Sequence, residues 1–322
     1  MTFAGSPDRV EARLVPERGY AFDAFRIAGF PRRPGVRLFR ALALAAASPV
    51  ACLRILGRRR PDVVLGGGGY VAGPMVLAAW LRRTPAALTE ADAQLGLANR
   101  LATPFARRLF LAYPTAGAGT KGRVVGRPIP ASSRAKPQAD ARAALGLPQD
   151  GHVVVVFGGS LGARTLNELA IDAWGNAGPA VLHICGERDY ERLHGRVTRP
   201  DYHLVPFLED FGAALGAADL IVARAGGSVW EIAAAGKPAV LVPYPEATAD
   251  HQRANAQHFE RAGGAIVVLD RDARENVPPL VKQLLTTPGR LEKMGSAMRA
   301  AAKPDAAERI ADELVVLATS RR

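Results

Sequence analysis

The chain of 322 residues is poor in cysteine and in aromatic residues, and it has no long uninterrupted apolar run. Its two cysteines, Cys52 and Cys185, lie far apart and form no C-x-x-C pair, which excludes a disulfide scaffold and favours buried thiols. The first residues lack the charged and apolar regions of a signal peptide, so the sequence predicts a cytosolic compartment. No Ser-His-Asp arrangement and no metal-ligand spacing is evident, so we expect no metal site.

Positive charge is in excess, and it lies almost entirely in the first third of the chain. Residues 1–115 hold 17 arginines, no lysine and 7 acidic residues, whereas residues 116–322 hold 25 basic and 23 acidic residues. One domain is therefore expected to meet a negatively charged partner, either nucleic acid, an anionic membrane surface or a phosphorylated substrate. Nucleic acid fits worst, because the arginines surround an apolar stretch and are not interleaved with stacking aromatic residues.

That apolar stretch is Ala41–Leu53, which has 13 charge-free residues and includes Pro49. A membrane-spanning helix needs about 20 residues, so this stretch is too short to cross a bilayer. Arginines and apolar side chains flank it, as in an element that lies in a lipid interface, and a core helix with solvated ends would explain the same pattern. The candidate membrane-facing residues are Arg37, Phe39, Arg40, Arg58, Arg59 and Arg60.

Short apolar runs alternate with helical segments rich in alanine and leucine along the whole chain. The runs do not alternate in polarity, which is typical of parallel strands covered by helices on both faces. The sequence predicts two doubly wound α/β domains, residues 1–128 and 129–322, with the last helix returning to the first domain and a ligand cleft between them. The predicted strands include Asp62–Leu65, Ala86–Leu88, Val153–Phe157, Ala180–Cys185, Leu220–Ala223, Ala239–Val242 and Ile266–Leu269.

Two glycine clusters each follow a predicted strand and precede a helix. The first contains Gly69, Tyr70 and Gly73, and its run of four glycines exceeds what a tight turn requires, which favours close approach of a ligand. The second, Gly158–Gly162, matches neither a dinucleotide fingerprint nor a P-loop. It indicates a phosphate or diphosphate site with Ser160 as a hydroxyl donor, or a helix that Ser160 merely caps.

Polar side chains follow three other predicted strands. Ser228 and Glu231 form a capping box, which explains Glu231 by itself, although the same carboxylate is suited to accept the hydroxyls of a ribose. His251 and Gln252 belong to a polar helix start that either reads sugar hydroxyls or is simply solvated. Glu90 and Asp92 are candidates for a general base if they line the cleft, and are otherwise surface acids. Asp250 and Asn255 belong to the same polar helix start as His251 and Gln252, and Gly159 and Gly162 belong to the second glycine cluster.

Taken together, these segments resemble the MurG family, the UDP-N-acetylglucosamine:lipid I N-acetylglucosaminyltransferases of peptidoglycan synthesis. The resemblance spreads over almost the whole chain and keeps the family's order. It is carried by Gly5–Gly19, Gly67–Pro74, Phe157–Asn167, Ala223–Pro243 and Asp250–Ala256. It implies the GT-B fold, with donor UDP-GlcNAc bound mainly by the C-terminal domain and lipid I meeting the N-terminal domain at the cytoplasmic face of the cell membrane.

The resemblance also implies roles for individual residues. Ser160 and the Gly158–Gly162 loop would hold the diphosphate, Glu231 the ribose, and His251 with Gln252 the hydroxyls of GlcNAc. Gly69, Tyr70 and Gly73 would belong to the acceptor side. The implied reaction is inverting transfer of GlcNAc to the 4-hydroxyl of MurNAc, with helix N-termini stabilising the departing UDP and no obligatory cofactor. The sequence does not indicate a divalent cation.

The chain departs from the family pattern in three places. The acceptor loop reads Thr89-Glu90-Ala91-Asp92 where the family has His-Glu-Gln-Asn, and Leu161 stands where Gln is common. The family begins with a strand, a glycine-rich loop ending in His and a helix, and this chain starts after them. We therefore expect an incomplete N-terminal domain with unpaired strand edges, and a 322-residue chain that folds poorly and is inactive. A UDP-sugar transferase with another lipid acceptor and an inactive nucleotide-sugar-binding protein are the alternative functions.

Overall fold

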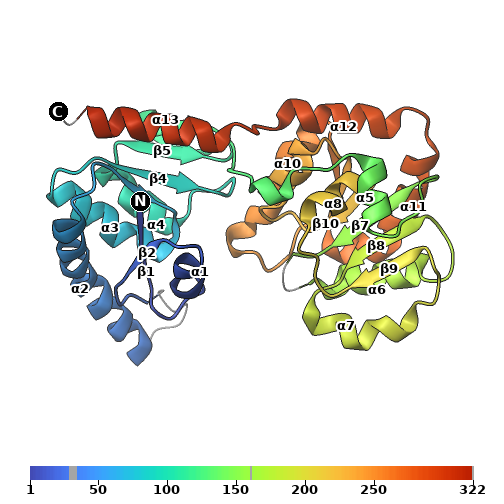
Figure 1. Cartoon of the computed structure of the whole chain (residues 1–322), viewed down its shortest axis with the longest axis horizontal. Coiled ribbons are helices and arrows are strands. Elements are labelled where there is room, and N and C mark those ends of the chain that lie inside the picture. The colour runs from blue at the N-terminus through green and yellow to red at the C-terminus, as the bar shows by residue number, and fades with distance from the viewer. Residues whose placement is uncertain (29–34, 160–161, 321–322) are drawn as a thin grey trace. The chain divides into compact units, whose positions relative to one another are not determined.

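The computed structural model describes residues 1–28, 35–159 and 162–320. The chain divides into two compact units, and each is described by itself. Unit 1 comprises Met1–Val125 and Glu308–Arg322, and unit 2 comprises Gly126–Ala307. The division thus falls just before residue 128, and the C-terminal segment belongs to the first unit (Figure 1).

Unit 1 contains two parallel sheets. One has the order β1-β2 and the other the order β3-β4-β5-β6. Within the described residues β1 pairs only with β2, and β3 pairs only with β4. The elements are β1 (Thr2–Gly5), α1 (Glu11–Glu17), β2 (Ala21–Ala24), α2 (Val36–Arg59), β3 (Val64–Gly66), α3 (Gly69–Leu81), β4 (Ala86–Glu90), α4 (Leu97–Ala102), η1 (Thr103–Phe105), β5 (Arg108–Leu111), η2 (Gly119–Lys121), β6 (Gly122–Val124) and α13 (Ala306–Thr319).

The larger sheet of unit 1 is covered on both faces. Leu88, Leu109 and Leu111 pack with buried residues of α2 and α3 in one apolar cluster. Their neighbours Ala87 and Phe110 point to the other face, as the period of two in a strand requires, and pack with Ile310 and Leu317 of α13. Figure 1 shows α13 running along β5. The C-terminal helix therefore completes the core of unit 1.

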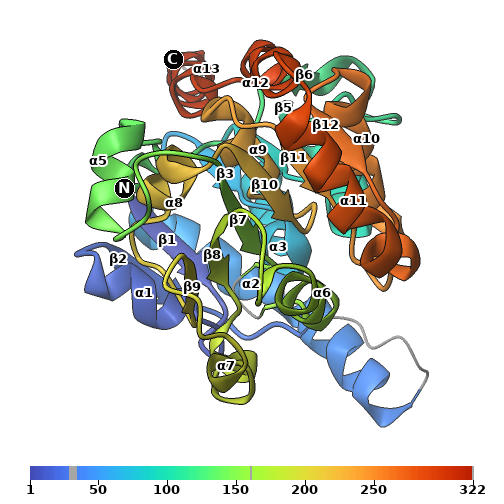
Figure 2. The ribbon, with the colours of Figure 1, turned by 90° about the vertical axis from the view of Figure 1, so that its right-hand side faces the viewer.

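Unit 2 has one parallel sheet with the order β12-β11-β10-β7-β8-β9. The strand β7 is completely buried, which confirms the interpretation of its continuous apolar run. Helices α6 and α11 lie on one side of the sheet, and α5 and α8 on the other (Figure 2). The elements are η3 (Ala131–Ser133), α5 (Gln138–Ala144), β7 (Val153–Phe157), α6 (Arg164–Trp174), β8 (Ala180–Ile184), α7 (Glu187–Leu193), η4 (His194–Arg196), β9 (Tyr202–Val205), α8 (Phe211–Ala217), β10 (Leu220–Ala223), α9 (Val229–Ala234), β11 (Ala239–Leu241), η5 (Thr248–Asp250), α10 (His251–Arg261), β12 (Ala265–Val267), η6 (Asp270–Asp272), α11 (Ala273–Thr286) and α12 (Arg290–Ala301).

The strand order of unit 2 reverses between β7 and β10. From β7 the chain proceeds outward through β8 and β9, and then returns to place β10, β11 and β12 on the other side of β7. In open parallel sheets ligands bind at the carboxyl ends of the strands at such a reversal. The predicted donor residues follow β7, β10 and β11, so the topology brings them to one edge.

Candidate functional site

The glycine loop after β7 leaves its backbone open to a ligand. Gly159 and Gly162 have positive φ values of 89° and 71°, a conformation that favours glycine. A Cβ on Gly162 would overlap the carbonyl oxygen of Cys185, whereas one on Gly159 would meet nothing within 4 Å. The loop leads directly into α6, whose N-terminal N–H groups are suited to an anion. Ser160, the predicted hydroxyl donor, lies outside the described residues.

The capping box predicted at the start of α9 does not form. Ser228 has φ −61° and ψ −13°, a helical conformation instead of the extended one of an N-cap, and its side chain accepts no capping hydrogen bond. Glu231 is half-buried in the first turn of this helix. Its carboxylate has no hydrogen bond or ion pair with any residue that the structure describes. The capping explanation of Glu231 therefore fails.

The loop after β11 carries His251 and Gln252. Gln252 Oε1 accepts a hydrogen bond of 2.9 Å from the backbone N–H of Tyr244, so one end of its amide group orders this loop. His251 is the first residue of α10 and follows two residues with positive φ, Ala249 at 53° and Asp250 at 54°. Such strain at non-glycine residues costs about 1–3 kcal/mol each and is common at ligand sites.

A buried arginine that the sequence analysis did not select links these loops. Arg224 donates to the carbonyl oxygens of Val242 at 3.1 Å and Pro243 at 3.2 Å, and it forms an ion pair of 2.5 Å with Asp270. Thr165 in the first turn of α6 donates to the other oxygen of Asp270 at 3.2 Å. Arg224 thus connects the carboxyl ends of β10, β11 and β12 with the start of α6. The sequence feature that could have identified Arg224 is its place directly after a buried strand.

In unit 1 the carboxylate of Glu90 is engaged at the end of β4. Its Oε2 accepts hydrogen bonds from the N–H of Gly96 at 2.8 Å and from Asn99 Nδ2 at 3.0 Å. Its Oε1 accepts from the N–H of Asp92 at 3.4 Å. Glu90 therefore orders the loop that carries Asp92, which is the work of a positioning group.

The glycine loop of unit 1 lies beside this carboxylate. β3 and β4 are neighbours, and Asn99, which bonds to Glu90, also donates to the carbonyl oxygen of Thr89 at 2.9 Å. Gly69 has a φ of 69° and begins α3, and Gly73 lies one turn further along that helix. The hydroxyl of Tyr70 accepts a hydrogen bond of 3.0 Å from Arg9 Nε. The predicted acceptor residues and both acids thus share one sheet edge.

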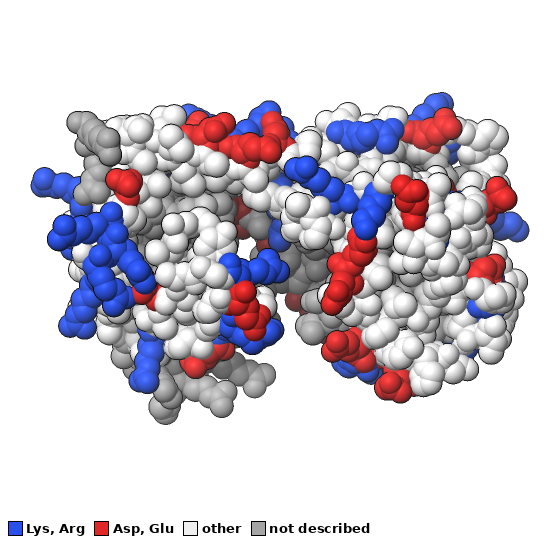
Figure 3. Space-filling model, viewed as in Figure 1, with Lys and Arg blue, Asp and Glu red and all other residues white. Residues whose placement is uncertain are grey.

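Two of the predicted membrane-facing arginines are exposed and also have a partner within the chain. Arg58 and Arg59 both pair with Asp23, whose side chain is only 6% exposed, and Arg59 Nε lies 2.8 Å from Asp23 Oδ2. The hydrogen bond from Arg59 lowers the pKa of the Asp23 carboxyl. Arg60 is exposed as well. The structure does not describe the side chains of Arg37, Phe39 and Arg40. Figure 3 shows basic side chains gathered over α2.

No group of three or more potential metal ligands occurs among the residues that the structure describes. Likewise, none of the helices in the described ranges is both long and apolar enough to cross a membrane.

Similarity to known protein families shows the class of enzyme. Residues 2–111 match the glycosyltransferase family 28 N-terminal domain, and residues 153–310 match its C-terminal domain. With its two α/β units, the chain is therefore a family 28 glycosyltransferase of the GT-B fold. A calicheamicin glycosyltransferase, 17% identical, shares this fold with a TM-score of 0.67 over 98% of this chain and 90% of its own.

Proteins with higher sequence identity show which family of these glycosyltransferases the chain belongs to. A Salinibacter ruber protein is 38% identical over all of this chain and 90% of its own length, and one from Halorhodospira halophila is 40% identical over 97% and 88%. Both are named UDP-N-acetylglucosamine--N-acetylmuramyl-(pentapeptide) pyrophosphoryl-undecaprenol N-acetylglucosamine transferase. Acinetobacter baumannii MurG is 28% identical, with a TM-score of 0.79 over 97% of this chain and 90% of that one. The chain belongs to the MurG family.

Proposed function

We propose that this protein transfers GlcNAc from UDP-GlcNAc to the 4-hydroxyl of MurNAc in lipid I, with inversion, to give lipid II. The names of its relatives support the reaction. The observation that carries it within the chain is the carboxyl edge of unit 2, where a glycine loop and Glu231 follow adjacent strands at the reversal of the sheet order, and where the Glu231 carboxylate has no partner among the described residues.

On the donor side, the loop containing Gly158, Gly159, Ser160 and Gly162 holds the diphosphate. Backbone N–H groups at the start of α6 stabilise the negative charge that develops on UDP as it leaves. Glu231 accepts hydrogen bonds from the ribose hydroxyls. An ionised carboxylate can only accept hydrogen bonds, and the two hydroxyls can donate them. His251 and Gln252 contact the hydroxyls of GlcNAc.

On the acceptor side, lipid I meets Gly69, Tyr70 and Gly73. Asp92 takes the proton from the attacking 4-hydroxyl, and Glu90 places Asp92 by holding its loop. In-line attack by that hydroxyl on the anomeric carbon breaks the bond to UDP and inverts the configuration. The charges of the diphosphate are balanced by dipoles and hydrogen bonds of the protein.

A transfer assay tests this function. The protein is incubated with UDP-GlcNAc radiolabelled in the sugar, together with lipid I or with diacylglycerol, and the lipid products are separated. Label in lipid II alone is the result expected from the proposed function, and it would overturn the expectation from the sequence that this chain folds poorly and is inactive. Label on diacylglycerol would instead support a transferase with another lipid acceptor. Binding of UDP-GlcNAc without transfer to either lipid would support an inactive nucleotide-sugar-binding protein.

We also propose that unit 1 docks on the anionic inner leaflet of the cell membrane. Exposed arginines at and near the end of α2, Arg54 and Arg60, lie on the helix that packs against α3. α3 ends in Trp80 and Leu81, which are 52% and 53% exposed. Cations beside exposed aromatic and aliphatic side chains are typical of surfaces that lie in a lipid interface.

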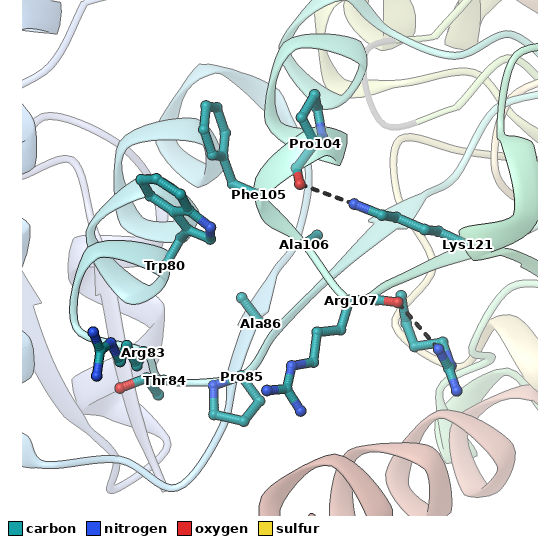
Figure 4. Close-up of a pocket in the computed structure, with 11 residues that line it drawn as sticks. Trp80, Arg83, Thr84, Pro85, Ala86, Pro104, Phe105, Ala106, Arg107 and Lys121 are labelled. Atoms are coloured by element: carbon teal, nitrogen blue, oxygen red, sulfur yellow. Dashed lines mark hydrogen bonds between the residues drawn. The ribbon is translucent and has the colours of Figure 1, made fainter. Parts of the chain in front are cut away.

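A pocket of about 610 Å³ adjoins Trp80 and adds to this surface. Figure 4 shows Trp80 and Phe105 along one wall, with their ring centroids 5.3 Å apart. Arg83, Arg107 and Lys121 line the same pocket, and none of its lining residues is acidic. The pocket therefore continues the positive charge of α2 along the amino-terminal ends of β4 and β5.

Sedimentation with liposomes tests the docking proposal. Arg54→Glu combined with Arg60→Glu should weaken binding to vesicles that contain anionic phosphatidylglycerol, since each basic residue near such a surface contributes about 1 kcal/mol. Lys282→Glu with Lys293→Glu, two exposed cations of unit 2, is the matched control and should change binding little. Equal effects of the two double variants would contradict the proposal.

A further inference from the structure

A chain of hydrogen bonds lies buried beneath the glycine loop of unit 2. The hydroxyl of Tyr202 on β9 lies 2.9 Å from His183 Nδ1 on β8, and His183 Nε2 lies 3.0 Å from Asn167 Oδ1 on α6. Asn167 Nδ2 donates to the carbonyl oxygen of Cys185 and to Asp189 Oδ2, each at 2.9 Å. Asn167 and His183 are fully buried, and Tyr202 and Asp189 are nearly so.

The chemistry of the end groups sets the direction of this chain. The Asn167 amide nitrogen carries two hydrogens and donates both, so its oxygen has to accept from His183. His183 therefore carries its proton on Nε2, and its Nδ1 accepts from the hydroxyl of Tyr202. Burial lowers the pKa of His183 to about 3, which keeps the imidazole neutral. Every bond thus runs from Tyr202 toward Cys185 and Asp189.

The Cys185 carbonyl connects this chain to the donor site. The same oxygen that accepts from Asn167 is the atom that a Cβ on Gly162 would overlap. Asn167 belongs to the first turns of α6, the helix that begins directly after the glycine loop. A rotation of the Asn167 amide would therefore shift both the start of α6 and the surface against which Gly162 packs.

We propose that Tyr202, His183 and Asn167 are positioning residues that hold Gly162 and the start of α6 in the geometry that binds the donor's diphosphate. The inference rests on the proposed function, because it takes the glycine loop as the diphosphate site. None of the three side chains touches the ligand. They orient the amide group of Asn167, and this amide group orients the backbone that contacts the diphosphate.

The test separates diphosphate binding from general stability. UDP and uridine affinities are measured by calorimetric titration or competition for the intact chain and for Tyr202→Phe, which removes one hydroxyl. Affinity for UDP should fall about tenfold, as expected when a buried polar group loses its partner, while affinity for uridine should stay within about twofold. His183→Gln, which keeps an N–H donor for Asn167, should bind UDP more tightly than His183→Leu.

Two controls sharpen the result. Tyr190→Phe removes a hydroxyl that has no hydrogen bond to a described residue, and Val281→Ala loosens the core of unit 2 on α11. Both should keep the ratio of UDP to uridine affinity. Equal losses for UDP and uridine in Tyr202→Phe, or a ratio no different from that of Val281→Ala, would overturn the inference alone. An intact chain that binds neither UDP nor UDP-GlcNAc would overturn the proposed function, and the inference with it.

Discussion

Gly162 is the residue whose replacement the donor loop should tolerate least. It combines a positive φ with direct packing on the Cys185 carbonyl, whereas Gly159 has the positive φ but open space around it. Gly162→Ala should therefore destabilise unit 2 by more than the 1–3 kcal/mol typical of a strained residue and should abolish UDP binding. Gly159→Ala is the matched control, and urea unfolding with UDP titration measures both. Similar losses would show that packing on Cys185 is unimportant.

Asp23 should matter for stability and not for catalysis. Because its pKa is lowered in the folded state, its contribution is present above the pKa of the unfolded chain and is lost as the pH falls through the folded value. Asp23→Asn should lower the free energy of unfolding at pH 7 by about 1–3 kcal/mol, since two arginines lose a charged partner. The difference from the intact chain should shrink below pH 4, as measured by urea unfolding. A difference independent of pH would contradict the ion-pair role.

At the scale of helices, the N-termini of α8 and α9 behave differently. Asp210 caps α8 by accepting a hydrogen bond of 3.0 Å from the N–H of Ala213, while Ser228 makes no such bond at α9. Asp210→Ala should cost about 1 kcal/mol of stability, and Ser228→Ala less than about 0.5 kcal/mol. Urea unfolding of the two variants checks this. An equal cost would mean that Ser228 caps α9 in solution.

Local sequence patterns predicted the strands well and the side-chain partners less well. Val153–Phe157 is a continuous apolar run, and burial on both sheet faces is its natural outcome. The spacing of Ser228 and Glu231 indicated a helix cap. The backbone at Ser228 is helical, however, and the spacing of two residues does not specify the backbone conformation. The pairing of Arg58 and Arg59 with Asp23 joins residues about 35 positions apart, so no local pattern contains it. The same holds for the contact of His183 with Tyr202.

At the scale of the whole molecule, the positive charge of unit 1 has several uses. Arg58 and Arg59 pair with Asp23, Arg9 contacts Tyr70 at the start of α3, and Arg108 forms an ion pair of 3.2 Å with Glu313 of α13. Arg54 and Arg60 are exposed arginines that we assign to the membrane. Unit 2 has nearly balanced charge, and we assign the binding of the anionic donor to backbone groups at its reversal of strand order.

The proposed function requires that the carboxyl edge of unit 2 binds UDP-GlcNAc through Glu231. Calorimetric titration of UDP-GlcNAc into the intact chain, Glu231→Gln and Ser228→Ala tests it most directly. Binding by the intact chain, a loss of about tenfold in Glu231→Gln and unchanged affinity in Ser228→Ala is the expected result, because only the carboxylate accepts both ribose hydroxyls with full charge. Absence of binding by the intact chain, or equal affinity of Glu231→Gln, would contradict donor binding through Glu231.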